Sequence, residues 1–379
     1  MRSPVAFPKL RENHVAVAFV VVGVVILLPY LVIPSSDDLS SRDVARIAEF
    51  QHLRQTVGET IWPGFGKGQI PLALVKGKME YLFDHPSPPS GYKPVRIPSY
   101  PGAVFRRKGH TLPRLAMTAI PVGGVLAALM PDKATFDQVA SVLELNSDSS
   151  VLEAAMSGGV DTVDTAVYEV VAVHEGFHAF QIKRDIARLQ RMSDLPPGSL
   201  DEKLFAARLK EAEATTEITK LLRVESRHLA LALAAGSLGV RRDEAQLFLE
   251  ARDARRQATA AKAEGLTIAS VAVHENAIEW CEGMATYVEG QTCRLAAGNS
   301  YKPLDLMAGL SDFHGYASLA KSKDWSLDRS ADMASHARSY VVGAGICLLL
   351  DRLGAEWKKP AIEELLPLDE LLRRALESR

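Results

Sequence analysis

The chain has 379 residues, of which 47% are hydrophobic and 24% charged, a balance that is ordinary for a folded protein with a substantial core. The formal net charge is only -2, and the sequence has no stripe of basic residues with interleaved aromatic residues, so a nucleic-acid partner is not expected. The three cysteines form no CxxC pair and allow at most one disulfide bond within the chain.

The first strong pattern is an uncharged apolar segment at residues 15–33. At about 1.5 Å of rise per residue, a helix of this length comes close to the ~30 Å hydrocarbon core of a bilayer. Basic residues precede the segment and acidic residues follow it, which predicts a cytoplasmic N-terminus at 1–14, a transmembrane anchor at 15–33 and an extracytoplasmic domain at 35–379. A cleaved signal peptide is the alternative, although its apolar region is usually only about 7 to 15 residues long. The expected localisation is the cell membrane, with a single pass.

The next part of the chain predicts one helix and a small sheet. Residues 41–57 follow an amphipathic helical pattern, and residues 72–83 contain two apolar runs around a lysine–glycine turn, which indicates a pair of strands. The proline-rich stretch 86–101 predicts a long surface excursion without regular structure. The apolar run 115–129 is rich in isoleucine, valine and glycine, and it predicts a further strand and turn.

The remainder of the sequence is mostly helical in pattern. Helices are predicted near residues 163–193, 201–235, 241–264, 267–290, 330–353 and 361–378. The charged run from Arg252 to Arg256 is typical of a solvated helix face. The predicted fold class is therefore α+β and mostly helical, with a small N-terminal sheet packed on a helical domain and one transmembrane helix in front.

The segment VAVHEGFHAFQ, residues 171–181, carries the strongest chemical motif. On a helix, His174 and His178 lie one turn apart and project from one face, so both imidazoles can reach a single ion. Zinc suits two neutral nitrogen ligands, and Glu175 is then left to accept a proton from a metal-bound water. The motif predicts a zinc site on this helix.

A second helix, with the sequence ENAIEWCEGMATYVEG, offers further ligands. Its glutamates at 275, 279, 282 and 289 lie along one broad face. Such a pattern usually marks a solvated acidic face, but the intervening residues are largely apolar and indicate that some of the carboxylates are enclosed. Enclosed carboxylates need a cation or hydrogen bonds. Glu279 and Glu282 are one turn apart, so spacing alone does not choose between them as the third zinc ligand.

Together, HEGFHAFQ and EGMATYVE resemble the gluzincin clan of zinc metallopeptidases, in which a third ligand in an EGxAxY-type sequence follows the HExxH helix. The resemblance covers roughly residues 165–355 and implies a zincin-like helical domain with a long helical insertion at about 190–265. It implies that His174, His178 and Glu282 are the zinc ligands and that Glu175 is the general base.

The same resemblance assigns supporting roles around the site. Gly283 and Ala285 are small enough to allow two helices to approach closely at the metal, and Glu279 is expected to accept a ring N–H from one of the two histidines. The clan also implies a tyrosine or histidine that stabilises the oxyanion. Tyr340 is the candidate, with His336 one turn earlier as the alternative; a core tyrosine is the other interpretation of Tyr340.

The expected activity is hydrolysis of peptide bonds by a membrane-anchored zinc metallopeptidase. Its partner is a peptide or protein substrate, which could lie along an edge strand of the small sheet and add main-chain hydrogen bonds.

Two alternatives from other classes remain open at this point. The ExxH pairs Glu175–His178 and Glu225–His228 could belong to a di-iron helical bundle. The chain could also be a membrane-anchored scaffold that keeps a zincin-like site without catalysis. The intact Glu175 argues against the scaffold, because a structural metal site has no need of that carboxylate.

Overall fold

The computed structural model describes residues 36–109, 111–146, 163–182, 200–322, 327–333 and 335–378. Within these residues the protein is mostly helical and contains one mixed sheet of six strands. The strands are β1 (Leu72–Lys76), β2 (Met79–Phe83), β3 (Lys93–Val95), β4 (Val104–Lys108), β5 (Thr118–Val122) and β6 (Val125–Pro131). Their order in the sheet is β3-β4-β2-β1-β6-β5, and only the β1–β6 pair is parallel.

The predicted strands are confirmed, with one correction. Strands β1 and β2 form a hairpin in which Lys76 pairs with Met79, and β5 and β6 form another across Gly123 and Gly124. Both glycines have positive φ, as a tight two-residue hairpin turn requires. The proline-rich stretch was expected to lack regular structure, but it contains β3. Pro94 is tolerated there because β3 is an edge strand, where a missing N–H need not break a ladder hydrogen bond.

Helices make up most of the remaining described chain. The longer ones are α1 (Ser41–Ile61), α2 (Lys133–Asn146), α4 (Thr165–Ile182), α6 (Leu200–Glu213), α7 (Thr216–Ala234), α8 (Leu238–Lys262), α9 (Ile268–Ile278), α10 (Met284–Ala296), α12 (Ser335–Arg352) and α14 (Leu368–Glu377). Short ones are the π-helical turn η1 (Glu279–Gly283), the 3-10 turns η2 (Asp305–Gly309) and η3 (Leu327–Asp332), and helices α11 (Ala317–Ser322) and α13 (Lys358–Glu363).

Most predicted helices are present, but several are divided. The expected helix 201–235 is α6 followed by α7, because Thr215 caps α7 by accepting a hydrogen bond from the Ile218 N–H. The expected helix 361–378 is split into α13 and α14. Helix α2 was not predicted, and the predicted residues 183–193 lie outside the described part of the chain.

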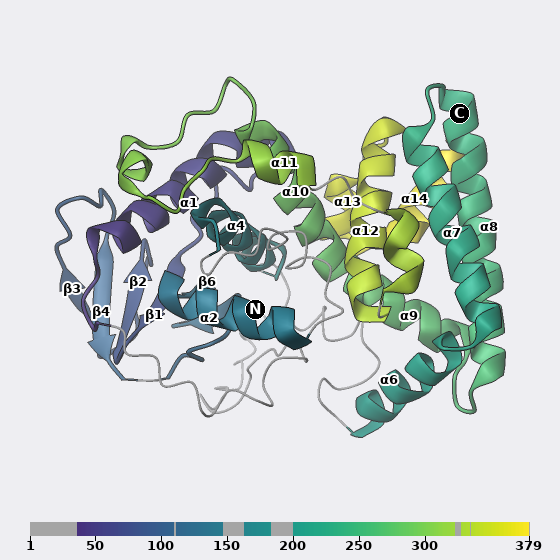
Figure 1. Ribbon diagram of the computed structural model, residues 1–379, viewed down its shortest axis with the longest axis horizontal. Helices are drawn as coiled ribbons and strands as arrows, with labels where there is room; N and C mark the ends of the chain where they lie inside the picture. Colours follow the sequence, from purple (N-terminus) through teal and green to yellow (C-terminus); the bar gives the residue numbers. More distant parts are fainter. Residues whose placement is uncertain are drawn as a thin grey trace, which may run out of the picture.

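The sheet and the helical bundle occupy opposite ends of the molecule, with α4 and α10 between them (Figure 1). Helix α4 packs against β5 and β6 on one side and against α1 and α10 on the other. The helix-facing side of the sheet joins the main core through residues such as Leu74, Tyr81 and Met130. The opposite side is covered by loop residues that include Tyr92 and Leu112.

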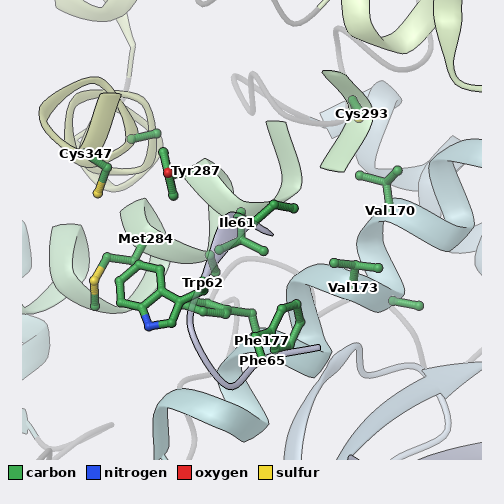
Figure 2. Packing of buried hydrophobic residues seen from close by; sticks show 14 of the residues in the cluster. Ile61, Trp62, Phe65, Val170, Val173, Phe177, Met284, Tyr287, Cys293 and Cys347 are labelled. Carbon is green, nitrogen blue, oxygen red and sulfur yellow. The ribbon is translucent and has the colours of Figure 1, made fainter. Parts of the chain in front are cut away.

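An aromatic cluster holds α4 in place. Phe177 lies within the HExxH motif, and its ring meets those of Trp62 and Phe65 at centroid distances of 5.0 and 5.3 Å (Figure 2). Trp62 in turn stacks edge-on against Trp357, with centroids 5.1 Å apart. Such edge-to-face contacts restrict the position of each ring, so the histidines on either side of Phe177 are carried by a firmly packed helix.

The membrane part of the predicted fold requires correction. Among the described residues, no helix is both long enough and apolar enough to cross a bilayer; even the well-buried α4 carries Glu169 and Glu175 as well as two histidines. The predicted span 15–33 lies outside the described residues. The supported fold class is a mostly helical protein with a six-stranded mixed sheet, and the expected single-pass localisation in the cell membrane is not supported.

Candidate metal centre

Helix α4 presents His174 and His178 on one face, toward η1 and α10. Nearly all of α4 is buried, and the two histidines are only 7% and 6% exposed. Gly176 lies between them, and a Cβ atom there would be 3.2 Å from the ring of Phe50 on α1. The small residue therefore allows α1 to pack closely behind the histidines, which turns both imidazoles away from α1.

The π-helical turn η1 supplies the third side chain, Glu282. A π-turn is wider than an α-helical turn, is rare, and frequently occurs at functional sites. It packs backbone against backbone on α12, since a Cβ atom on Gly283 would lie 2.6 Å from the Cα atom of Gly343. The expected close approach at Gly283 is confirmed, but the helix that approaches it is α12 and not the HExxH helix.

Three potential ligand atoms meet between α4 and η1. The Nε2 atoms of His174 and His178 lie 3.1 Å apart, and each lies 3.3 Å from Oε2 of Glu282. Around a tetrahedral zinc ion with bonds of about 2.0 to 2.1 Å, ligand atoms are separated by about 3.3 Å. Among the described residues, His174, His178 and Glu282 form the one group of His, Cys, Asp and Glu side chains whose ligand atoms lie close enough to hold a metal ion.

Hydrogen bonds on the far side of each ring determine where the ring proton resides. Nδ1 of His174 lies 3.2 Å from Oε2 of Glu289, and Nδ1 of His178 lies 2.9 Å from Oε1 of Gln181. The Gln181 amide nitrogen donates to the carbonyls of Trp280 and Cys281, which leaves its oxygen for the histidine. Both Nδ1 atoms therefore donate. In the neutral rings, both Nε2 lone pairs point into the triangle.

Burial and charge make the triangle attractive to a cation. Burial raises the pKa of Glu282, but the imidazoles of His178 and His174 outweigh it and hold the pKa well below its usual range. For His178, burial lowers the pKa, yet the Glu282 carboxylate and the Cys281 thiol raise it well above its ordinary value. The ionised Glu282 carboxylate therefore stabilises positive charge in this site, either as a proton on His178 or as a metal ion in place of that proton.

The two predicted catalytic residues lie beside this triangle. Glu175 is 7% exposed, and burial raises its pKa against the opposing effect of the two histidines. The ring of Tyr340 on α12 stacks on that of His174, with centroids 6.5 Å apart and planes 14° apart. Burial and the nearby Glu282 carboxylate raise the pKa of Tyr340 well above its usual value, so its hydroxyl stays protonated and can donate. Nε2 of His336 lies 3.3 Å from that hydroxyl.

The predicted role of Glu279 is wrong. Its carboxylate does not accept a ring N–H from either histidine but pairs with Arg252 of α8. The partners of the histidines are Glu289 and Gln181 instead. Gln181 carried a usable signal, because it follows His178 by three residues on the same helix and can reach back toward it.

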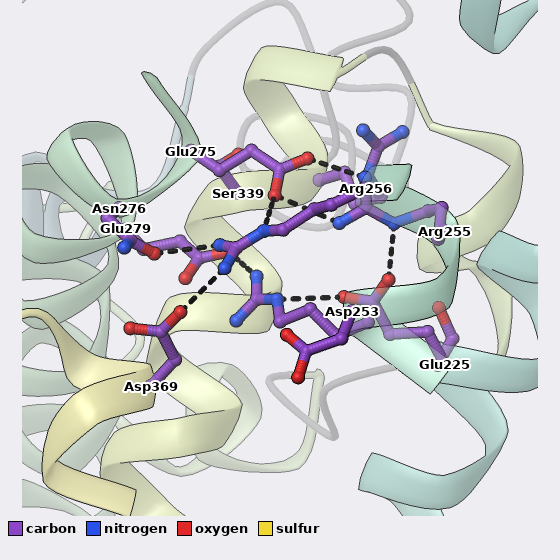
Figure 3. A network of polar contacts seen from close by, with 12 residues as sticks. Glu225, Asp253, Arg255, Arg256, Glu275, Asn276, Glu279, Ser339 and Asp369 are labelled. Carbon is purple, nitrogen blue, oxygen red and sulfur yellow. Dashed lines mark hydrogen bonds and ion pairs between the residues drawn. The ribbon is translucent and has the colours of Figure 1, made fainter. Parts of the chain in front are cut away.

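The charged run at 252–256 is also different from the prediction. Arg252, Arg255 and Arg256 are not on a solvated face but are 1%, 1% and 4% exposed. They pair with buried carboxylates from four other elements (Figure 3), namely Glu225, Glu275, Glu279 and Asp369. The expectation that some carboxylates of ENAIEWCEGMATYVEG are enclosed is thereby confirmed, and for two of them the compensating cations are arginines.

This network bears on the di-iron alternative. Glu225 faces Arg252 and Arg255, and His228 bonds through Nδ1 to Glu244 at 2.7 Å. Neither residue joins the His174–His178 triangle, and a guanidinium beside Glu225 repels a second cation. The described geometry therefore favours a single metal ion.

The three cysteines are buried and free, and Cys281 lies 3.7 Å from Nδ1 of His178, on the side of the ring away from the triangle.

No protein-family model, curated protein or solved structure matches the chain. The resemblance to gluzincins therefore rests on the HEGFHAFQ and EGMATYVE sequences alone.

Proposed function

We propose that the protein is a zinc-dependent peptidase that uses His174, His178 and Glu282 as its metal ligands. One observation carries the proposal: two imidazole Nε2 atoms and one carboxylate oxygen meet at 3.1 to 3.3 Å, while Nδ1 of each ring is occupied by a separate acceptor. A metal ion bound between these three atoms would replace the proton that His178 holds in the metal-free protein.

The donor set favours a catalytic zinc site over a structural one. Structural zinc is usually enclosed by four protein ligands, whereas catalytic zinc has three and leaves one position open. Two imidazoles and one carboxylate are the ligand types of the hydrolytic three-ligand sites. The buried Glu175, which a structural site would not need, lies in the same helix turn.

When bound, zinc would polarise the carbonyl of a scissile peptide and lower the pKa of an attacking water. Glu175 would accept the proton of that water and deliver it to the leaving amine. Its buried setting raises its pKa, which suits a group that must hold a proton between two steps. The protonated hydroxyl of Tyr340 would donate a hydrogen bond to the oxygen on which negative charge develops.

The sheet supports an extended peptide as the substrate. Within the described chain β5 is the edge strand on the side where α4 packs. Because Val122 pairs with Val125 across a two-residue turn, alternate residues of β5 direct their backbone groups outward. A substrate backbone would pair with these outward groups as an additional strand.

The proposal is tested by metal content and by replacement of the base. Purified protein should contain about one zinc per chain, whereas two irons would favour the di-iron alternative and no metal the scaffold. Glu175→Gln should retain zinc and lose peptide hydrolysis by a factor on the order of 10² or more, with cleavage of a peptide library followed by mass spectrometry. Glu282→Ala should abolish tight zinc binding.

The matched control is Glu244→Gln, which changes a helical glutamate that pairs with His228 away from the triangle. It should leave both zinc content and hydrolysis unchanged. Hydrolysis by Glu175→Gln at the wild-type rate would exclude the assigned base, and wild-type zinc affinity in Glu282→Ala would exclude the assigned ligand.

A further inference from the structure

The π-turn η1 separates two glutamates that an α-helix would place on one face. Glu282 points to the histidines, and Glu279, three residues earlier, points to Arg252 of α8. Residues three apart in an α-helix are neighbours on its surface, whereas the wider π-turn moves them apart. The direction of Glu282 therefore depends on the π-turn being kept.

The π-turn is held from two sides. On one side, the backbone of α12 lies against it, and a Cβ atom on Gly343 would be 2.9 Å from the carbonyl oxygen of Glu279. On the other side, Arg252 bonds to the Glu279 carboxylate and also lies 3.2 Å from Oε1 of Glu225 on α7. Arg252 thus ties η1 to both helices of the α7–α8 pair.

The environment of Glu279 makes this tie specific. Glu279 is 2% exposed, and its second carboxylate oxygen has no hydrogen-bond partner among the described residues. Arg255 and Arg256 bond instead to Glu275 on α9 and leave the η1 carboxylate to Arg252. Without Arg252, the Glu279 carboxylate would be buried without its ion-pair partner, which favours a rearrangement of the turn.

A rearranged turn would displace the third ligand. Relaxation of η1 to an ordinary α-helical turn shifts the residues beyond it by one position, which is a rotation of about 100° around the helix axis. Glu282 would then leave the face that meets His174 and His178. Among the ion pairs of the described residues, Arg252–Glu279 is the one that joins the α7–α8 pair directly to a side chain of η1.

We propose that Arg252 and Glu279 are positioning residues for the metal centre: the buried pair holds the π-turn in the register that directs Glu282 to the two histidines. The inference rests on the proposed zinc site. It adds that α7 and α8, which belong to the predicted helical insertion, control the direction of the third ligand, Glu282.

The test compares variants of the full chain by chelator competition for Zn²⁺ and by the visible absorption spectrum of the Co²⁺-substituted protein, which reports ligand geometry. Arg252→Met and Glu279→Ala should weaken zinc binding about 10- to 100-fold and change the cobalt spectrum. Glu279→Gln keeps an oxygen that accepts from Arg252, so it should bind zinc and cobalt as the wild type does.

Arg256→Met is the matched control, because it removes another buried guanidinium, whose ion-pair partners are Glu275 and Asp369 and not Glu279. It should lower thermal stability without changing the zinc affinity or the cobalt spectrum. If Arg252→Met does not fold, the comparison of Glu279→Ala with Glu279→Gln decides the same question.

Folded Arg252→Met and Glu279→Ala proteins with wild-type zinc affinity and cobalt spectrum would overturn the inference and leave the zinc site intact. A His174→Ala variant that binds zinc with wild-type affinity would overturn the proposed site, and the positioning role with it.

Discussion

Nδ1 of His174 lies 3.2 Å from Oε2 of Glu289, a carboxylate on α10 seven residues beyond Glu282 and therefore about two helical turns away. The contiguous elements η1 and α10 thus supply both a candidate ligand and the acceptor that orients another candidate ligand. Because Glu289 is 3% exposed, its hydrogen bond to the imidazole is not weakened by solvent.

Removal of this acceptor should weaken metal binding without removing a ligand. Glu289→Ala is expected to lower zinc affinity about 10- to 100-fold, because the ring of His174 loses the partner that fixes its tautomer. Glu289→Gln retains an acceptor oxygen and should lose less. Chelator competition measures both. Glu244→Ala breaks a comparable contact, with Nδ1 of His228, and should leave zinc affinity unchanged; an equal loss in the two alanine variants would contradict the assigned role.

Zinc binding should release a proton. The pKa of His178 is raised well above its usual value, because the Glu282 carboxylate and Cys281 outweigh the effect of burial, so metal-free protein holds a proton on this ring at neutral pH. A metal ion must displace that proton. Apparent zinc affinity should therefore rise with pH, by about tenfold per pH unit for one coupled proton, until the pKa of His178 is passed.

Calorimetric zinc titrations at pH 7, in two buffers of different ionisation enthalpy, measure this proton. About one proton released per zinc is expected. His228→Ala removes a histidine that is paired elsewhere and should not change the number. Zinc binding with the same observed enthalpy in both buffers would contradict the prediction.

The histidine pair could be predicted from the sequence because its geometry is local. A four-residue spacing puts His174 and His178 on one face of any α-helix, whatever surrounds it. Local helix geometry does not distinguish Glu282 from Glu279 as the third ligand, since both fit one α-helical face. The π-turn that separates them depends on contacts with Gly343 and Arg252, which are distant in the sequence.

The buried arginines show a second limit. Arginine side chains are usually solvated. The local sequence around Arg252, Arg255 and Arg256 does not reveal the carboxylates on other helices that neutralise them. The strands of the two hairpins, in contrast, were predictable because each turn is marked by glycine and each strand by its apolar run. Side-chain pairing between distant segments is the part that periodicity does not encode.

The backbone contact between Gly283 and Gly343 should not tolerate a methyl group. In Gly283→Ala, the new Cβ would lie 2.6 Å from the Cα atom of Gly343, so η1 and α12 would have to separate. We expect a loss of about 1 to 3 kcal/mol in the free energy of unfolding, together with weaker zinc binding. Denaturant unfolding with and without zinc measures both effects.

Gly239→Ala provides the control, because Gly239 is also helical and a Cβ atom there would meet nothing within 4 Å. That change should be neutral or stabilise by up to about 1 kcal/mol. Equal stability of the two alanine variants would mean that the two helices do not pack as closely as described.

The last prediction concerns Glu169, a buried carboxyl group on α4 outside the metal triangle. It is 0% exposed, and neither carboxyl oxygen has a hydrogen-bond partner within the described chain. Burial and the neighbouring Glu49 raise its pKa well above the usual value, although Arg46 and Lys133 oppose them. The folded state therefore keeps a proton on Glu169 that the unfolded state loses above its ordinary pKa.

The sign of the pH effect follows from this difference. Since the folded protein binds more protons, stability falls as pH rises above the unfolded-state pKa of Glu169, by about 1.4 kcal/mol per pH unit until the folded-state pKa is reached. Glu169→Gln resembles the protonated acid and should not share this loss. Its stability relative to wild type should thus increase with pH, as denaturant unfolding between pH 5 and 9 would show.

Glu80 gives a control of opposite sign. It is also buried, but hydrogen bonds from Leu112, Tyr92 and Arg107 outweigh burial and lower its pKa. Its ionised form stabilises the fold, and that stability is present above the unfolded-state pKa and lost as pH falls through the folded-state pKa. Glu80→Gln should therefore destabilise most at neutral pH, and its difference from wild type should shrink toward acid pH. A constant stability difference between Glu169→Gln and wild type across this range would contradict the prediction. It would show that Glu169 is ionised in the folded protein.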